Sequence, residues 1–322
     1  MTLRPRTSTD MPDEAQPRLL YATTPISRRQ FGRLLAAAAV IGLPMAGATR
    51  VRANDSATTD TIEKSLSVYP ELNMTSTDTE FLLPEEIAAG RYLVTIENQS
   101  TQGESAPVFV LLKDGQTSDE LMAEPGDPAG GLPAWFLTGT IIGAPIAPLG
   151  MTAQAIIDFP AGNYAVSGEP YQPTGTLRVT GGNGKSFADA DVEETIMMAD
   201  DGWTGMPETV TTGKHLWKVT SNGSVPHRFQ LYSYPEPVTV DALVAALSLE
   251  QGATPPPDSP DITLAVPLGG LSPMSPGQTG WPVIDLEPGF YIGLCTVQNG
   301  EAAIPHYLSN ELTVFSVEDP AG

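Results

Sequence analysis

Residues 143–166 read GAPIAPLGMTAQAIIDFPAGNYAV, and residues 269–292 read GGLSPMSPGQTGWPVIDLEPGFYI. The two stretches share the unit D-[FL]-x-x-G-x-Y and align without a gap from Gly150 and Gly277 onward. In this unit the aspartate ends one strand, the glycine turns the chain and the tyrosine opens the next strand, which is typical of a β-hairpin. The aligned residues are Asp158 with Asp285, Gly162 with Gly289, and Tyr164 with Tyr291. The chain therefore carries the same hairpin twice.

The repetition extends upstream of the hairpin. The matching segments are GRYLVTIEN (90–98) with GKHLWKVTS (213–221), and APVFVLL (106–112) with VPHRFQL (225–231). We call the N-terminal member copy one and the C-terminal member copy two. Where copy one has Val108 and Gly168, copy two has His227 and Cys295. A duplicated fold with metal-ligand residue types in one copy predicts a single site on a two-domain scaffold.

The strand pattern predicts an all-β protein. The candidate segments are short, rich in Val, Ile, Thr and aromatic residues, and bounded by Gly and Pro, which is typical of an antiparallel sandwich. We expect strands at 91–97, 108–113, 153–159, 162–167 and 174–180 in copy one, and at 216–221, 228–233, 281–286, 289–295 and 311–317 in copy two. Each copy also contains one short amphipathic helical stretch, at 117–123 and 240–249.

The chain divides into five expected parts. They are a signal peptide at 1–53, a flexible leader at 54–73, copy one at 74–180, a linker at 181–187 and copy two at 188–322. The leader is polar and lacks strong periodicity, and the linker begins with Gly-Gly-Asn-Gly, a composition typical of a flexible joint.

The N-terminal segment has the pattern of an export signal. SRRQF (27–31) places Arg28 and Arg29 after a serine, as in twin-arginine signals. The Ala- and Gly-rich stretch 34–48 is weakly apolar and too short to span a bilayer comfortably, and a small-residue cleavage pattern ends at Ala53. We therefore expect export by the twin-arginine route to the periplasm, the cell surface or the extracellular space, with no membrane span in the mature chain.

The expected mature chain is strongly acidic. Residues 1–53 hold 8 of the 16 Lys and Arg but only 3 of the 38 Asp and Glu, which leaves 8 basic and 35 acidic residues and a net charge of −27 in residues 54–322. Such a field repels nucleic acid and anionic lipid headgroups, so we expect no nucleic-acid partner. It attracts cations or a basic partner protein, or it only keeps an exported protein in solution.

Three side chains of copy two form a candidate metal site. Strand alternation puts His227 on the apolar face of its strand near the strand's start, and Cys295 on the face of Tyr291 at the end of another. His306 follows in a loop that contains Gly300 and Pro305. Two imidazoles and a thiolate are the ligand class expected of a type 1 copper site, so we expect one copper ion.

At these residues the chain resembles the cupredoxin family. His227 matches the histidine that the family takes from an early strand, Cys295 matches its thiolate, and His306 matches the histidine of its C-terminal ligand loop. The resemblance covers residues 75–318 in strand order and hairpin, and copy two alone in ligands. It implies two tandem Greek-key sandwiches of cupredoxin type, copy one without metal ligands, and electron transfer to a redox partner protein or copper holding.

The ligand loop departs from the family pattern in two ways. Ten residues separate Cys295 from His306, which is longer than most blue-copper loops, and no methionine follows His306 in HYLSNELTV. The axial ligand is therefore missing, or it is replaced by a backbone oxygen, by Glu311 or by a distant methionine such as Met274.

Enzymatic activity is disfavoured, and two other interpretations stay open. The chain has 3 histidines and no G-x-S-x-G motif, whereas multicopper oxidases and copper nitrite reductases need additional histidines for their catalytic coppers. The rival to a copper protein is a metal-free extracytoplasmic binding or structural β-sandwich module, with Cys295 and His227 as ordinary buried residues. The third interpretation is a redox-sensing thiol, in which Cys295 reacts readily with a thiol reagent.

Overall fold

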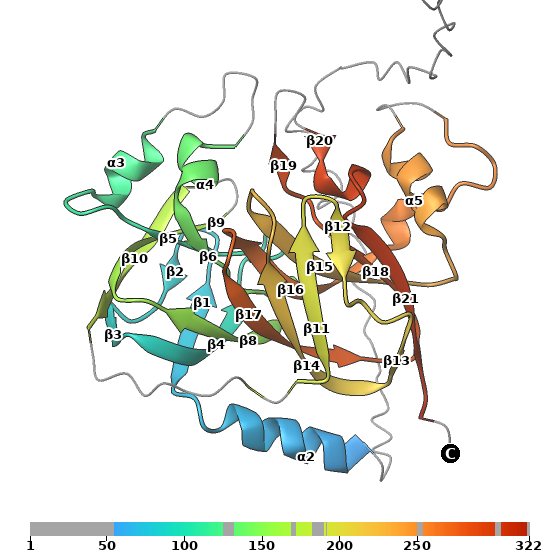
Figure 1. Cartoon of the computed structure of the whole chain (residues 1–322), viewed down its shortest axis with the longest axis horizontal. Helices are drawn as coiled ribbons and strands as arrows, with labels where there is room; N and C mark the ends of the chain where they lie inside the picture. The colour runs from blue at the N-terminus through green and yellow to red at the C-terminus, as the bar shows by residue number, and fades with distance from the viewer. Residues whose placement is uncertain are drawn as a thin grey trace, which may run out of the picture.

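A computed structural model describes residues 55–124, 132–168, 172–181, 190, 192–249, 254–299 and 304–320 (Figure 1). Strands dominate these parts of the chain, and the helices are few and short. The expected signal peptide at 1–53 and most of the expected linker at 181–187 lie outside the described residues. Within the described ranges, no helix is both long enough and apolar enough to cross a bilayer.

One sheet of eight strands runs through both copies. Its order is β12-β11-β14-β17-β8-β4-β1-β2, with the first four strands from copy two and the last four from copy one (Figure 1). The strands are β1 (Glu71–Ser76), β2 (Phe81–Leu82), β4 (Gly90–Asn98), β8 (Thr152–Phe159), β11 (Glu194–Ala199), β12 (Gly202–Thr204), β14 (Gly213–Ser221) and β17 (Thr279–Leu286). The order is palindromic, because each strand has its counterpart at the mirror position of the other copy.

A second sheet completes the sandwich of each copy. Its order is β3-β10-β9-β5-β6 in copy one and β13-β21-β18-β15-β16-β7 in copy two, where the edge strand β7 is contributed by copy one. The strands are β3 (Glu86–Ala88), β5 (Val108–Leu111), β6 (Thr140–Ile142), β7 (Pro145–Ile146), β9 (Gly162–Gly168), β10 (Gln172–Thr180), β13 (Thr209–Thr211), β15 (His227–Tyr234), β16 (Val266–Met274), β18 (Gly289–Leu294) and β21 (Leu312–Glu318). Alternate residues such as Phe109, Phe159, Trp217 and Phe229 fill the core. The chain is thus an all-β protein of two β-sandwich domains.

Equivalent strands of the repeat form the junction between the copies. β8 pairs antiparallel with β17, and Ala155 lies opposite Pro282. Because Asp158 and Asp285 are equivalent, Ala155 and Pro282 are equivalent as well, and each lies opposite its own counterpart. This is the pairing of an isologous interface, in which two like units associate about a two-fold axis. Backbone pairing therefore joins the two domains into one unit.

The strands and helices expected from the sequence are largely confirmed. All ten expected strands form, and their ends differ from the expected ones by at most three residues. The expected helices appear as α3 (Ser118–Met122), with a complete capping box from Thr117 and Glu120, and α5 (Val240–Leu247). Helix α4 (Ala134–Thr138), the 3₁₀ turns η2 (Ile262–Leu264) and η3 (His306–Leu308), and strand β16 with its paired glycines were not expected.

The flexible leader expected at 54–73 is wrong for the described part of this segment. Residues 55–66 form helix α2 (Asp55–Leu66), which lies along one face of the eight-stranded sheet (Figure 1). Its residues Ile62 and Leu66 are buried in a cluster with Tyr69, Leu216 and Trp281. Ile62, Leu66 and Tyr69 follow helical spacing, which the polar residues between them concealed. Helix α2 thereby covers a face of the shared sheet.

Buried serines of copy two hold backbone groups of copy one. Ser272 accepts a hydrogen bond from the Ala144 N–H at 2.8 Å and donates one to the Pro107 carbonyl at 2.5 Å. Ser275 accepts from the Ile141 N–H at 2.8 Å. The contact between the domains is therefore specific and polar as well as apolar.

We predict that Ser272→Ala destabilises the whole chain. The substitution leaves a buried N–H and a buried carbonyl without the serine hydroxyl, and each such group costs about 1–3 kcal/mol. Urea unfolding should give a lower free energy of unfolding, with both domains lost in one transition. Ser67→Ala is the control, because that hydroxyl is exposed and bonds only to the end of α2; equal stability of the two variants would contradict the prediction.

Candidate metal centre

Four buried side chains of copy two converge at one end of its sandwich. They are His227, Cys295, His306 and Glu311, and one ligand atom of each lies within 4.8 Å of the ligand atoms of the others. The three residues singled out from the sequence are therefore brought together. The fourth, Glu311, is one of the replacements considered for the axial position, and the sequence signal for it is its place soon after His306.

Strand ends and a folded loop position these residues. His227 opens β15, and Cys295 follows the last residue of β18. The Cys295 N–H donates to the Glu311 carbonyl at 3.0 Å, and the His306 N–H donates to the Val297 carbonyl at 2.9 Å. Strands β19 (Gln298–Asn299) and β20 (Ile304–Pro305) pair within the loop. Because the two strands run antiparallel, the chain reverses between Cys295 and His306. His306 therefore lies beside Cys295 despite the ten residues between them.

The two imidazoles turn the same nitrogen toward the centre. His227 Nδ1 lies 2.8 Å from Glu311 Oε2, and His306 Nδ1 lies 3.1 Å from Glu311 Oε1. His306 Nδ1 also lies 3.4 Å from Cys295 Sγ, and the two ring centroids are 5.0 Å apart. Two nitrogens, one sulfur and one carboxylate thus face a common point.

The charge state of the group follows from burial and contacts. Burial raises the pKa of the Cys295 thiol well above its ordinary value of 9.0, and the Glu311 carboxylate raises it further. Burial also opposes ionisation of Glu311, but the close contacts and charges of His227 and His306 outweigh it and lower the pKa of that carboxyl below 4.5. Without a metal, the thiol is protonated and the carboxylate accepts a hydrogen bond from His227 Nδ1. A cation replaces these protons when it binds.

The residues present fit a metal ion. Glu311 Oε1 is buried without a hydrogen-bond partner among the described residues, because the approach of His306 lacks hydrogen-bond alignment. Such an oxygen is costly in an apolar interior unless it binds something. Met274, the other side chain considered for the axial position, has its sulfur beside Gly143 of copy one. Glu311 is therefore the fourth candidate ligand.

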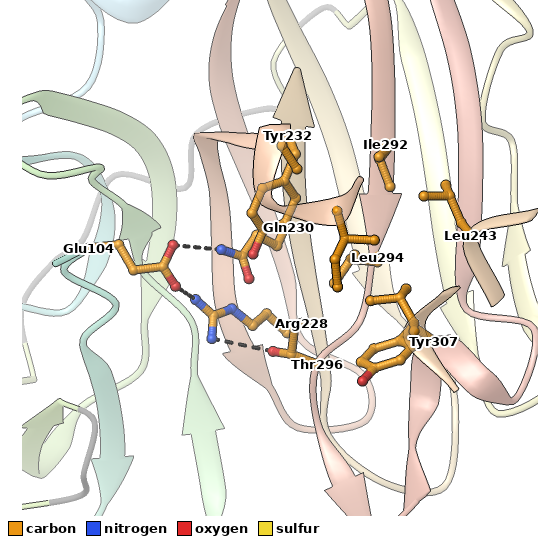
Figure 2. Close-up of a pocket in the computed structure, with 12 residues that line it drawn as sticks. Glu104, Arg228, Gln230, Tyr232, Leu243, Ile292, Leu294, Thr296 and Tyr307 are labelled. Carbon is orange, nitrogen blue, oxygen red and sulfur yellow. Dashed lines mark hydrogen bonds and ion pairs between the residues drawn. The ribbon is translucent and has the colours of Figure 1, made fainter. Parts of the chain in front are cut away.

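The reverse face of the same strands lines a pocket in copy two, to which Glu104 of copy one also contributes. Each of the three ligands expected from the sequence is followed by a lining residue: Arg228, Thr296 and Tyr307 (Figure 2). Side chains alternate across a strand, so one layer of backbone separates this pocket from the metal centre at His227. The backbone N–H of Arg228 donates to Cys295 Sγ at 3.2 Å. The pocket therefore carries the residue that hydrogen-bonds the candidate thiolate ligand.

Copy one contributes a carboxylate that holds Arg228. Glu104 forms an ion pair with Arg228 and accepts a hydrogen bond from Gln230 Nε2 at 2.6 Å (Figure 2). The Arg228 and Glu104 side chains are 1% and 6% exposed, so this is a buried ion pair. A residue of the ligand-free copy thus supports the strand that positions the thiolate.

Copy one has no equivalent group in its described residues. Its counterparts of His227 and Cys295 are Val108 and Gly168, and a Cβ on Gly168 would lie 3.1 Å from the ring of Phe81. No second convergence of His, Cys, Asp and Glu occurs in the part of the chain that the structure describes. The third histidine, His215, lies elsewhere and contacts Glu193 and the Thr211 carbonyl.

Comparison with known proteins gives distant likeness only. No protein-family profile and no curated protein matches the chain. Among solved structures, auracyanin B is 15% identical, with 41% of this chain and 93% of that one covered and a TM-score of 0.25. Auracyanin from the photosynthetic bacterium Roseiflexus castenholzii is 22% identical, with 38% and 94% covered and a TM-score of 0.25.

A longer protein shows a similar degree of likeness. The multicopper oxidase from Pediococcus acidilactici is 9% identical, with 78% of this chain covered and a TM-score of 0.23, and the chain spans only 60% of its length. TM-scores at this level establish neither fold nor function. The fold of this chain rests on its own strand order, and its site rests on its own side chains.

We predict that Cys295 is unreactive in the metal-free native protein. Burial and the neighbouring carboxylate disfavour the thiolate, which is the reactive form. Reaction with a chromogenic disulfide reagent should be at least about tenfold slower than for the same thiol in denaturant, since each unit of raised pKa removes tenfold of the thiolate. Rapid reaction in the native state would instead favour the redox-sensing interpretation.

We predict that Glu104→Ala is strongly destabilising. Removing one partner of a buried ion pair leaves the Arg228 charge in the interior without its carboxylate, which costs about 3–5 kcal/mol. The matched control is Glu86→Ala, which breaks the exposed pair with Arg178 and should cost less than about 1 kcal/mol. Denaturant unfolding measures the free energy of unfolding of both variants. Equal decreases would contradict the prediction that the buried Glu104–Arg228 pair matters more than an exposed pair.

Proposed function

We propose that this chain is an exported, cupredoxin-like protein that binds one copper ion and serves electron transfer or copper holding. His227, Cys295 and His306 would form the N₂S set, and Glu311 would be the fourth ligand. The observation that carries the proposal is the convergence of four buried donor atoms within 4.8 Å in one copy of the repeat. The histidine count, which disfavoured enzymes above, also argues for a single redox site without a catalytic copper.

The donor set favours copper over other common metals. A thiolate disfavours magnesium, calcium and manganese, which prefer oxygen ligands. For a given set of nitrogen, oxygen and sulfur donors, the stability order of divalent metals places copper above zinc. Copper bound here would supply one-electron redox chemistry.

The protein's own residues would tune the ion. The Glu311 carboxylate is a harder donor than a thioether and should favour the Cu(II) state, which lowers the reduction potential relative to a site with an axial methionine. The hydrogen bond from the backbone N–H of Arg228 to Cys295 Sγ draws negative charge from the sulfur. It should therefore raise the reduction potential. Burial of all four ligands excludes water and keeps their geometry fixed.

The partner and the location are parts of the same proposal. A twin-arginine signal would export the folded chain, and that route suits a protein that acquires its metal before export. The net charge of −27 in residues 54–322 suits a basic redox partner. The competing function is a metal-free binding or structural module, in which the four polar side chains only satisfy one another.

We predict that the mature protein binds one Cu(II) per chain and develops strong visible absorption from thiolate-to-copper charge transfer. Cys295→Ser should abolish that absorption. Glu311→Gln should shift it and weaken copper binding by at least about tenfold, whereas Glu287→Gln, at an exposed position, should change nothing. Titration followed by visible spectroscopy and metal analysis measures these effects.

Three outcomes would contradict the proposal. No colour together with no bound metal would establish the metal-free module. Stoichiometric zinc that copper does not displace would make copper the wrong metal. A copper spectrum that persists in Cys295→Ser would place the ion away from the four residues.

A further inference from the structure

Asp200 contacts the outer nitrogen of a candidate ligand. It lies in the turn between β11 and β12, and its Oδ1 is 3.1 Å from His227 Nε2. The same carboxylate accepts the Ser224 N–H, at 3.0 Å and 2.9 Å from its two oxygens. Asp200 therefore lies within hydrogen-bond distance of both Ser224 and His227.

This contact selects the nitrogen of His227 that faces the centre. A carboxylate only accepts hydrogen bonds, so His227 Nε2 must carry a proton and donate it to Asp200. Glu311 accepts a hydrogen bond from the Nδ1 proton in the metal-free chain, and a metal ion that replaces this proton finds the lone pair on Nδ1 while Asp200 keeps the proton on Nε2. Metal-binding histidines commonly have their other nitrogen fixed in this way by a carboxylate.

Copy one contains the same carboxylate without the histidine. Ser76 pairs with the last residue of β4, Met198 pairs with the last residue of β14, and an aspartate follows each two residues later: Asp78 and Asp200. Asp78 accepts the Thr101 N–H at 2.6 Å, as Asp200 accepts the Ser224 N–H. Holding the next loop is therefore a structural role that both copies share, and the contact with an imidazole is an addition in copy two.

A glycine makes the added contact possible. A Cβ on Gly223 would collide with both His227 Nε2 and Asp200 Oδ1. Gly223 stands two residues after the end of β14, and the residue two places after the end of β4 in copy one is Ser100. A side chain is tolerated there in copy one, where Val108 makes no such contact.

We infer that Asp200 is a positioning residue that holds His227 in the Nε2-protonated form, with Gly223 leaving room for the contact, so that Nδ1 is presented to the copper ion. The inference rests on the proposed function and adds a residue outside the four ligands. Asn at this position would still accept from Ser224 but would present N–H groups to Nε2, which favours the opposite tautomer.

The experiment compares Asp200→Asn with the matched variant Asp78→Asn. Asp200→Asn should bind Cu(II) roughly 10–100-fold more weakly and show a shifted thiolate-to-copper band, while Asp78→Asn should match the wild type in both. Gly223→Ala should reproduce the Asp200→Asn result if both variants remain folded by circular dichroism. In addition, ¹⁵N NMR of the metal-free protein should find a proton on His227 Nε2 that is lost in Asp200→Asn.

Each outcome decides one question. If the wild type binds copper and Asp200→Asn binds it equally with an unchanged tautomer, the inference fails and the proposed function stands. If both aspartate variants weaken binding alike, Asp200 acts only by holding a loop, and the inference fails. If the wild type binds no metal, the proposed function fails, and so does any metal-directed role of Asp200, even where NMR finds the Nε2 proton.

Discussion

The candidate metal centre depends on the burial of four polar side chains in one place. A thiol, a carboxylate and two imidazoles in an apolar interior are costly unless each finds a partner. Here they partner one another: Glu311 accepts from His227 at 2.8 Å, and His306 lies 3.4 Å from Cys295 Sγ. One carboxylate oxygen still lacks a hydrogen bond among the described residues. The cluster thus satisfies most of its own polar groups and leaves one carboxylate oxygen to bind an ion.

The ligand-free copy has a physical role in this arrangement. Its strand β8 pairs with β17, its backbone satisfies Ser272 and Ser275, and its Glu104 holds Arg228. The backbone N–H of Arg228 in turn donates a hydrogen bond to Cys295 Sγ. Copy one therefore supports the strands of copy two that carry the candidate ligands. This gives the copy without ligands a structural role in the duplicated sandwich.

Local pattern predicted most of the fold and singled out three of the four residues that lie together in the buried cluster. Hairpin units and strand alternation depend on residues close in sequence, so the ten strands, His227 and Cys295 could be placed in advance. The eight-stranded sheet could not, because the pairing of β8 with β17 joins residues far apart in the chain. Glu311 was one alternative among several, since only folding of the loop around His306 brings its carboxylate inward. Helix α2 was missed because few of its residues are apolar.

Comparison of the two copies separates what the sandwich requires from what the site requires. An aspartate that holds the next loop occurs in both copies, as Asp78 and Asp200, so the sandwich accounts for it. A histidine in contact with that aspartate, and a glycine that admits the contact, occur only in copy two. At the position of Cys295, copy one has Gly168, where the ring of Phe81 leaves little room for a side chain. Few side-chain differences on one shared backbone plan therefore separate an apolar sandwich end from the buried cluster of His227, Cys295, His306 and Glu311.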